Sequence, residues 1–165
     1  MSSGYVAVVV RMEMQRMSRT GRVAGPALIG ERHFHREDLP ALRAFVSEYA
    51  TQTGATHEQV AILVLTASEL ATNAIIHGGG AGRLRLWRGT SHIVCEVTDS
   101  GRGMAADAGT QPPATAIGGG RGLWLIRSLT DDVEIDSGAF GTTVAAQLAL
   151  RPRRTVRTGG AHRSA

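Results

Sequence analysis

Three polar residues spaced four apart, Glu69, Asn73 and His77, interrupt an apolar stretch of the sequence. On a helix, residues four apart share one face. A carboxylate and an amide one turn apart beside an apolar stripe are costly to bury alone, and a ligand, a metal ion or water could partner them. Further along, Asp99 follows an apolar run and precedes two glycines, the first of them Gly101. Glycines let the backbone approach a ligand while Asp99 accepts a hydrogen bond, so both stretches indicate a binding site.

Each stretch also has an ordinary interpretation. Taken alone, Asp99-Ser100-Gly101 is typical of a turn, because Asp and Gly are frequent in turns. Glu69 and Asn73 alone could be a solvated helix face. His33 and His35 could ligate a metal from one side of a strand, but no Cys or carboxylate cluster supports them, so a surface pair is the simpler interpretation.

The element that must position Glu69 and Asn73 is a helix beginning at Thr56. Its apolar residues recur at helical spacing; they are Val60, Leu63, Val64, Ala67, Leu70, Ala71 and Ala74. Gln59 lies three residues after Thr56 and completes a capping box. We expect this helix to end at Gly78-Gly79-Gly80.

The remaining elements are expected on both sides of this helix. Asp38-Leu39-Pro40 provides an N-cap and a proline in the first turn of an earlier helix. The expected strands cover residues 27–35, 83–87, 93–97, 132–136 and 142–150, and the other helices residues 38–53 and 122–129. Helices grouped with hairpins indicate an α+β fold, with helices on one face of a mostly antiparallel or mixed sheet.

The hairpin and the long loop after it have distinct expected roles. Arg83 and Arg85 alternate with Leu84 and Leu86, which predicts a strand with one polar and one apolar face. Residues 104–120 have no periodicity, and a structureless loop of this length is typical of a lid or a binding loop. We expect it to be mobile without ligand, because it lacks periodic apolar residues to anchor it.

Composition and charge indicate one domain with basic ends. The chain has 165 residues, of which 42% are hydrophobic, enough for a single core. Its net charge of +4 divides into +3 for residues 1–30, −4 for 31–150 and +5 for 151–165. The folded part is therefore acidic, which argues against direct nucleic-acid binding. We expect a mobile leader at residues 1–26, a domain at 27–150 and a disordered tail at 151–165.

Residue types that are absent or rare in the sequence exclude further classes of protein. All eighteen basic residues are Arg, so a Walker phosphate loop, which needs Lys, is excluded. The single cysteine, Cys95, is expected in the core. The apolar run at residues 5–10 is too short to span a membrane, and basic residues follow it instead of preceding it as in a signal peptide. We expect a cytoplasmic protein without membrane contact.

Four motifs, in order and spacing, resemble the nucleotide-binding boxes of the GHKL ATPase superfamily. They are Glu69-x-x-x-Asn73 on a helix, Asp99-x-Gly101-x-Gly103 after a strand, Gly120-x-Gly122 opening a helix and Gly141-Thr142-Thr143 on a late strand. Within that superfamily the chain is most similar to small anti-sigma-factor serine kinases, and the resemblance covers roughly residues 31–150. It implies a two-layer α/β sandwich of the histidine-kinase-like ATPase (Bergerat) type.

The resemblance implies ATP and Mg²⁺ as cofactors and a role for each polar residue. Asn73 would bind Mg²⁺, a hard cation that prefers oxygen ligands. Glu69 would be the general base that takes a proton from the hydroxyl or water attacking the γ-phosphoryl group. Asp99 would accept from the adenine amino group. Thr142, with Thr143 as the alternative, would help to hold that edge.

The glycine boxes would contact the nucleotide through their backbone. Gly101 and Gly103 would permit close approach, and Gly120 and Gly122 would present N–H groups to the phosphates at a helix N-terminus. Arg121 could reach a phosphate or face solvent.

The resemblance therefore implies a serine/threonine protein kinase that phosphorylates a partner anti-anti-sigma protein, sequesters a sigma factor, or does both. The alternative is a nucleotide-dependent binding module without phosphotransfer. A detached sensor histidine kinase domain is a third interpretation, but His57-Glu58 lies only twelve residues before Glu69, too close for a separate phosphoacceptor hairpin. The same pair fails as a zinc motif because residue 61 is Ala. Whether the chain forms a homodimer is open.

Overall fold

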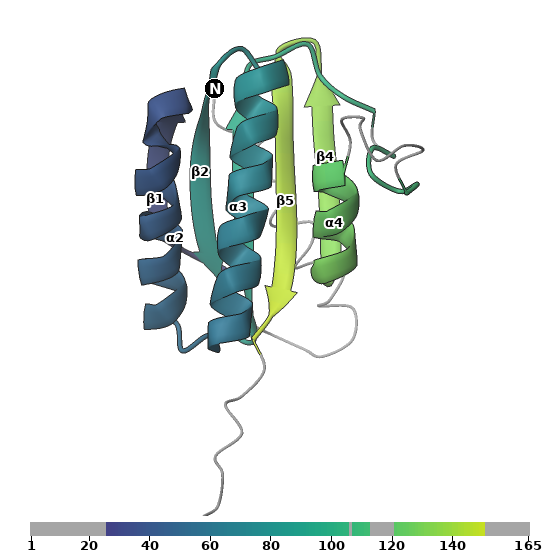
Figure 1. Ribbon diagram of the computed structural model, residues 1–165. Coiled ribbons are helices and arrows are strands. Elements are labelled where there is room, and N and C mark those ends of the chain that lie inside the picture. The colour runs from purple at the N-terminus through teal and green to yellow at the C-terminus, as the bar shows by residue number, and fades with distance from the viewer. Residues whose placement is uncertain (1–25, 106, 113–120, 151–165) are drawn as a thin grey trace, which may run out of the picture.

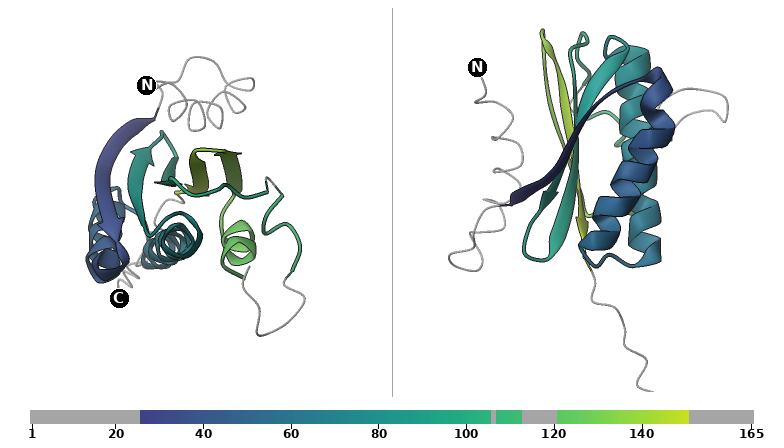
Figure 2. Two further views of the ribbon diagram at one scale, coloured as in Figure 1. Left: turned by 90° about the horizontal axis from the view of Figure 1, so that it is seen from above. Right: turned by 90° about the vertical axis from the view of Figure 1, so that its left-hand side faces the viewer.

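The computed structural model describes residues 26–105, 107–112 and 121–150. In these residues a five-stranded sheet is covered on one face by three helices, which gives the two layers seen in Figures 1 and 2. The strands are β1 (Ala27–His35), β2 (Ala81–Arg88), β3 (His92–Asp99), β4 (Asp132–Gly138) and β5 (Gly141–Ala149). The helices are α2 (Leu39–Gln52), α3 (His57–His77) and α4 (Arg121–Leu129), and a short 3-10 turn, η1 (Arg36–Asp38), precedes α2. The expected α+β sandwich is confirmed.

The strand order across the sheet is β1-β2-β3-β5-β4. Every pairing between these strands is antiparallel, so the sheet is antiparallel throughout and not mixed. The pairing of β3 with β5 joins two parts of the chain that are far apart in sequence. It places Asp99 opposite Thr142 and Thr98 opposite Thr143.

The central helix α3 begins and ends as its sequence predicts. The Thr56 side chain accepts from the backbone N–H of Gln59, and the Gln59 side chain accepts from the Thr56 N–H, so the capping box is present. Gly78 ends the helix. By length and composition alone α3 could cross a membrane, but its apolar face packs in the core of this domain, which accounts for its composition.

The start of α2 differs from the expected cap. Asp38 is at the N-cap position and Pro40 lies in the first turn, as predicted. The Asp38 carboxylate, however, accepts a hydrogen bond from the backbone N–H of His35 at 2.9 Å and makes no cap bond to α2. The 3-10 turn before the helix directs this side chain backward along the chain.

Alternation along the strands divides the sheet into a core face and an outer face. The core face meets the helices and carries apolar side chains, including Leu84, Leu86, Ile93, Cys95, Val97, Val144, Ala146 and Leu148. Cys95 is fully buried, as expected, and burial together with the neighbouring Glu96 raises the pKa of its thiol to about 12. The outer face carries Arg83, Arg85, Glu96 and Thr98, by the same alternation.

Candidate nucleotide-binding site

Asp99 is the last residue of β3, and it lies against Gly78 at the end of α3 and Gly141 at the start of β5. Its Oδ1 accepts a hydrogen bond from the backbone N–H of Gly101 at 2.9 Å. A Cβ at Gly78 would lie 2.3 Å from the Asp99 Cγ, and a Cβ at Gly101 would lie 2.6 Å from the Gly78 Cα. Only glycines allow this approach, and within the described part of the chain the second oxygen of this carboxylate has no hydrogen-bond partner.

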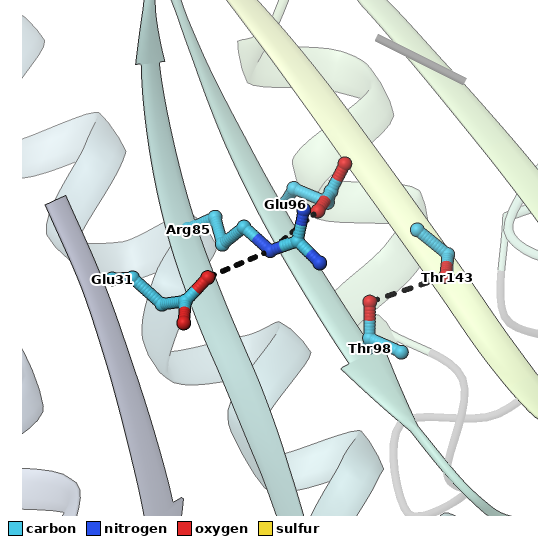
Figure 3. Close-up of polar contacts among 5 residues, drawn as sticks. All are labelled: Glu31, Arg85, Glu96, Thr98 and Thr143. Atoms are coloured by element: carbon cyan, nitrogen blue, oxygen red, sulfur yellow. Dashed lines mark hydrogen bonds and ion pairs between the residues drawn. The ribbon is translucent and has the colours of Figure 1, made fainter. Parts of the chain in front are cut away.

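Thr142 lies directly across from Asp99 on β5 and shares its core face. Its side chain is buried, and its Oγ1 lies 3.2 Å from the Ser137 Oγ. Thr143 points to the outer face, where its Oγ1 lies 3.1 Å from the Thr98 Oγ1 (Figure 3). Of the two threonines named from sequence, Thr142 is therefore the one beside Asp99.

Gly103 adopts a φ of +87°, and a Cβ there would lie 2.7 Å from the Ser137 Oγ. The same hydroxyl accepts from the backbone N–H of Met104 at 2.7 Å. Ser137 thus links the loop after β3 to Thr142. Sequence analysis did not name Ser137 or Gly78 as site residues, because Ser137 belongs to no motif and Gly78 was predicted only as the end of the helix; the fold brings them to Thr142 and Asp99.

Glu69 and Asn73 of α3 are both partly buried. A Cβ at Gly122, in the first turn of α4, would lie 2.4 Å from the Glu69 Oε2. The Glu69 carboxylate therefore touches the backbone at the start of α4. Arg121, the first residue of that helix, is exposed, and Gly120 lies outside the described residues.

These contacts place the sequence motifs along the C-terminal half of α3. Its Glu69 touches α4, and Gly78 at its C-terminus touches Asp99. From Glu69 to His77 a helix rises about 12 Å, and Asn73 lies midway. The structure thus brings the Asp99 box and the start of α4 into contact with the C-terminal half of α3, which carries the helix box, and the roles assigned to these residues remain predictions.

The polar groups suit a nucleotide with a hard metal ion. Asn73 and Glu69 offer oxygen atoms, and Mg²⁺ is usually held by few protein oxygens together with substrate phosphates. Among the described residues, no group of three or more His, Cys, Asp or Glu side chains converges on a point. The described residues therefore contain no cluster of such side chains that could hold a metal ion without a ligand.

Two open depressions lie around the loop after β3. One of about 420 Å³ is bordered by Asp99, Thr142 and the β4–β5 turn, where Phe140 is 95% exposed. Another of about 370 Å³ lies beside Gly103. A cleft of about 730 Å³ lies elsewhere, between the start of α3 and the end of α4. Since that cleft contains none of the motif residues, its volume does not identify the site.

The described part of the long loop is anchored more firmly than its composition predicts. Arg127 of α4 donates from Nε to the carbonyl of Ala108 at 3.0 Å. A Cβ at Gly109 would lie 2.6 Å from the Leu123 Cβ, so the loop packs closely on α4. Met104 and Ala108 also pack against the core. Contacts with α4 and the core therefore hold this part of the loop, although its sequence has no periodic apolar residues. Residues 106 and 113–120 lie outside the described residues.

Comparisons with known proteins agree with this arrangement. Residues 34–148 match the family described as the histidine kinase-like ATPase domain. The serine-protein kinase RsbW of Halalkalibacterium halodurans is 31% identical over 118 residues, which cover 62% of this chain and 72% of that protein.

Two solved structures resemble the fold. The structure of the RsbU and RsbW domains of a Mycobacterium tuberculosis protein has a TM-score of 0.53 at 22% identity, covering 74% of this chain and 33% of that one. This chain thus spans about a third of that protein's structure. The SiaB-SiaC complex of Pseudomonas aeruginosa has a TM-score of 0.58 at 11% identity, covering 88% of this chain and all of the matched chain. At these identities both support the fold alone.

Proposed function

This chain belongs to the histidine kinase-like ATPase domain family, and we propose that it binds ATP with Mg²⁺ and transfers the γ-phosphoryl group to a serine or threonine of a partner regulatory protein. The partner would be an anti-anti-sigma protein, with a sigma factor as a second, sequestered partner. Similarity to RsbW, a serine-protein kinase, supports this choice. The proposal also places the protein in the cytoplasm.

The observation that carries the proposal is the pair of contacts at the C-terminal half of α3, that of Glu69 with Gly122 and that of Gly78 with Asp99. A nucleotide that spans these two contacts would have its base near Asp99 and its phosphates near the start of α4. Backbone N–H groups at a helix N-terminus favour phosphate, so the polarity of α4 agrees with this direction.

At the adenine end, Asp99 recognises an amino group. Its Oδ1 is engaged by the Gly101 N–H, which holds the carboxylate in place. The second oxygen can accept from an exocyclic amine. Thr142 stands opposite and adds a hydroxyl to the same edge. Because positions 78 and 101 are glycines, Asp99 and the loop after β3 can pack directly against the end of α3, which fixes the carboxylate at this edge.

At the phosphate end, Asn73 and Glu69 would take separate roles one helical turn apart. The Asn73 amide oxygen would hold Mg²⁺, which neutralises phosphate charge when bound. Glu69 would accept the proton of the attacking hydroxyl. Its position against the Gly122 backbone keeps the carboxylate beside the phosphate-binding turn.

The test is a partner pull-down with and without ATP-Mg²⁺, followed by a phosphotransfer assay on the protein that binds. Glu69→Gln should keep ATP affinity but slow transfer by about 10²- to 10⁴-fold, the usual contribution of a general base. Asn73→Ala should lose metal-dependent ATP binding. Glu58→Gln, on an exposed position of the same helix, is the matched control and should behave as wild type.

The outcomes separate the two candidate functions. Phosphotransfer by Glu69→Gln at the wild-type rate would show that Glu69 is not the base. ATP-dependent capture of a partner by wild type, without transfer, would establish a binding module instead of a kinase. The absence of ATP binding by wild type would overturn both.

A further inference from the structure

Phe140, at the tip of the β4–β5 hairpin, is the most exposed large apolar side chain in the described part of the chain, at 95%. The next most exposed, Ile76 of α3, is 59% exposed. Single apolar side chains are common on protein surfaces, so exposure alone assigns no role. The position of Phe140 and the chemistry of its neighbours carry the assignment instead.

The turn itself does not require a phenylalanine. Gly138 pairs with Gly141, so Ala139 and Phe140 form a two-residue tip between the strands. Tight hairpin turns favour Asn, Asp and Gly, which adopt a positive φ readily. Neither Ala139 nor Phe140 has a positive φ, and the Phe140 ring packs against almost nothing in the domain. Neither turn geometry nor core packing therefore accounts for an aromatic residue here.

The hairpin holds the backbone of Phe140 beside Asp99. Gly141, the next residue, has a φ of +143°, and a Cβ on it would meet the Asp99 carbonyl oxygen. On the other side of the tip, the Ser137 Oγ lies 3.2 Å from the Thr142 Oγ1. Contacts on both strands thus fix the backbone at this end of the hairpin, while the Phe140 side chain extends into water.

The Phe140 ring borders the same depression as the two groups proposed to recognise adenine. This depression, of about 420 Å³, is lined by Phe140 together with Asp99 and Thr142. A carboxylate and a hydroxyl bind a base along its edge, in the plane of its rings. The two faces of the base are left for apolar contacts. An aromatic ring at the border of the depression can supply such a contact.

Rotation of the Phe140 side chain can bring its ring over a base held at Asp99. The Cα atoms of Phe140 and Gly141 are about 3.8 Å apart, as across any trans peptide bond, and Gly141 itself lies against Asp99. Exposed side chains change rotamer within picoseconds to nanoseconds. Because the ring is almost fully exposed, this movement breaks no packing in the domain.

We propose that Phe140 stacks on the adenine ring of the bound nucleotide and covers one face of the base, while Asp99 and Thr142 hold its edge. This rests on the proposed nucleotide binding and adds to it a residue outside the four sequence motifs. Stacking on an aromatic side chain accepts any base, because every base has a π face. Phe140 thus contributes affinity, and the edge contacts of Asp99 and Thr142 select adenine.

Calorimetry with ATP-Mg²⁺ measures the contribution of the ring. Phe140→Ala should bind ATP about 5- to 150-fold more weakly than wild type, the usual effect of removing a stacked aromatic side chain. Phe140→Tyr keeps the ring and should stay within about twofold of wild type. Phe140→Leu keeps apolar bulk without a π face and should weaken binding as Phe140→Ala does. Leu28→Ala, at a 47% exposed position of β1, is the matched control and should bind as wild type.

Fluorine NMR locates the ring. The chain contains three phenylalanines; Phe34 is 1% exposed, and the Phe45 ring lies 4.6 Å from the Tyr49 ring, centroid to centroid. In protein labelled with para-fluorophenylalanine, Phe140→Leu removes one of the three signals and so assigns it. ATP-Mg²⁺ should shift the Phe140 signal, because the purine ring current acts at stacking distance. It should leave the Phe34 signal unchanged. Inorganic tripolyphosphate with Mg²⁺, which has no base, should not shift the Phe140 signal.

Weaker ATP binding by Phe140→Ala together with the base-dependent shift supports the proposal. Equal ATP affinity of wild type and Phe140→Ala would overturn it and leave the proposed function standing. If Phe140→Ala also lost capture of the partner protein, the ring would belong to the partner surface instead. A shift of the Phe140 signal by tripolyphosphate would show movement of the turn without stacking, and would overturn the proposal as well. No ATP binding by wild type would overturn both this proposal and the nucleotide site.

Discussion

Two carboxylates on β3 lie three residues apart, on opposite faces of the sheet, in contrasting surroundings. Asp99, at the end of the strand, is partly exposed, accepts from a backbone N–H and is flanked by glycines. Glu96, in the middle of the strand, is 0% exposed and lies beside Arg85 and Trp87. Burial raises the pKa of Glu96, and the charges of Arg85 and Arg83 act in the opposite direction.

This contrast shows how the same chemical group is used in two ways. Around Asp99 the glycines let the backbone pack close to the carboxylate, and the side chain borders an open depression. Around Glu96 large side chains fill the space, and the arginine compensates for the charge. The surroundings distinguish the carboxylate that we propose to bind a ligand from the one buried in the sheet, so changes at the two positions should affect different properties.

The largest effect is expected from Arg85→Ala. Removal of the guanidinium group leaves Glu96 buried without its cation, which typically destabilises a protein by about 3–5 kcal/mol. Urea unfolding should show this loss in the free energy of unfolding. Arg43→Ala, at an exposed position of α2, should change stability by less than about 0.5 kcal/mol. Equal stability of the two variants would mean that Arg85 does not compensate Glu96.

Asp99→Asn should weaken ATP binding and spare stability. The substitution places an amide donor where a carboxylate would accept from the adenine amino group, at a cost of about 1.5–3 kcal/mol in binding free energy, or about 10- to 150-fold in Kd. Calorimetry measures the change. Asp132→Asn, an exposed residue of β4, is the control. Unchanged ATP affinity in Asp99→Asn would remove Asp99 from the proposed adenine site.

Gly78→Ala should impair the site through shape alone. The new methyl group would lie 2.3 Å from the Asp99 Cγ, so the carboxylate or the helix end must shift. Crowding of this kind typically costs about 1–3 kcal/mol, and ATP affinity should fall together with thermal stability. At Gly138 a Cβ meets nothing within 4 Å, so Gly138→Ala is the matched control. Identical melting temperatures and affinities for the two variants would contradict the close packing.

The smallest effect is expected in the pH dependence at Glu96. Because its pKa is raised in the folded protein, the folded state holds this proton to higher pH than the unfolded state does. Stability from this residue is therefore present at low pH and decreases as pH rises above the ordinary value of 4.5 through the folded pKa. Unfolding curves of wild type and Glu96→Gln should show the stability difference shifting in favour of the variant over this range. A constant difference would show that the Glu96 pKa is not raised.

Much of the fold could be predicted because its signals are local. The capping box of Thr56 and Gln59, the helical spacing of α3 and the glycines after it predicted the central helix from end to end. The hairpin was predicted from alternation, and Leu84 and Leu86 do face the core. Its polar face is present as well, since Arg83 and Arg85 lie on the side opposite Leu84 and Leu86, although Arg85 is only 7% exposed. Alternation shows which residues share a face but not what covers that face.

The candidate site could be outlined from the sequence to the extent that its motifs are contiguous, and the roles of its residues stay predictions. Glu69, Asn73, Asp99 and Gly101 carry recognisable spacing, and the contacts of Glu69 and Asp99 lie along the C-terminal half of α3. Ser137 has no such spacing, because it reaches Thr142 and Met104 only after β4 and β5 have formed a hairpin. Single residues supplied from another element leave no pattern for sequence analysis to detect.

The sequence by itself determined the helices, the strand faces, the order of the nucleotide-binding boxes and the family resemblance, because each depends on residues close together in the chain. Tertiary structure alone decided that Thr142 and not Thr143 lies beside Asp99, since a shift of one residue in the pairing of β3 with β5 would exchange them. It also decided that Glu96 is buried while Asp99 stays accessible. Burial depends on what packs over each face, and that is a property of distant parts of the chain coming together.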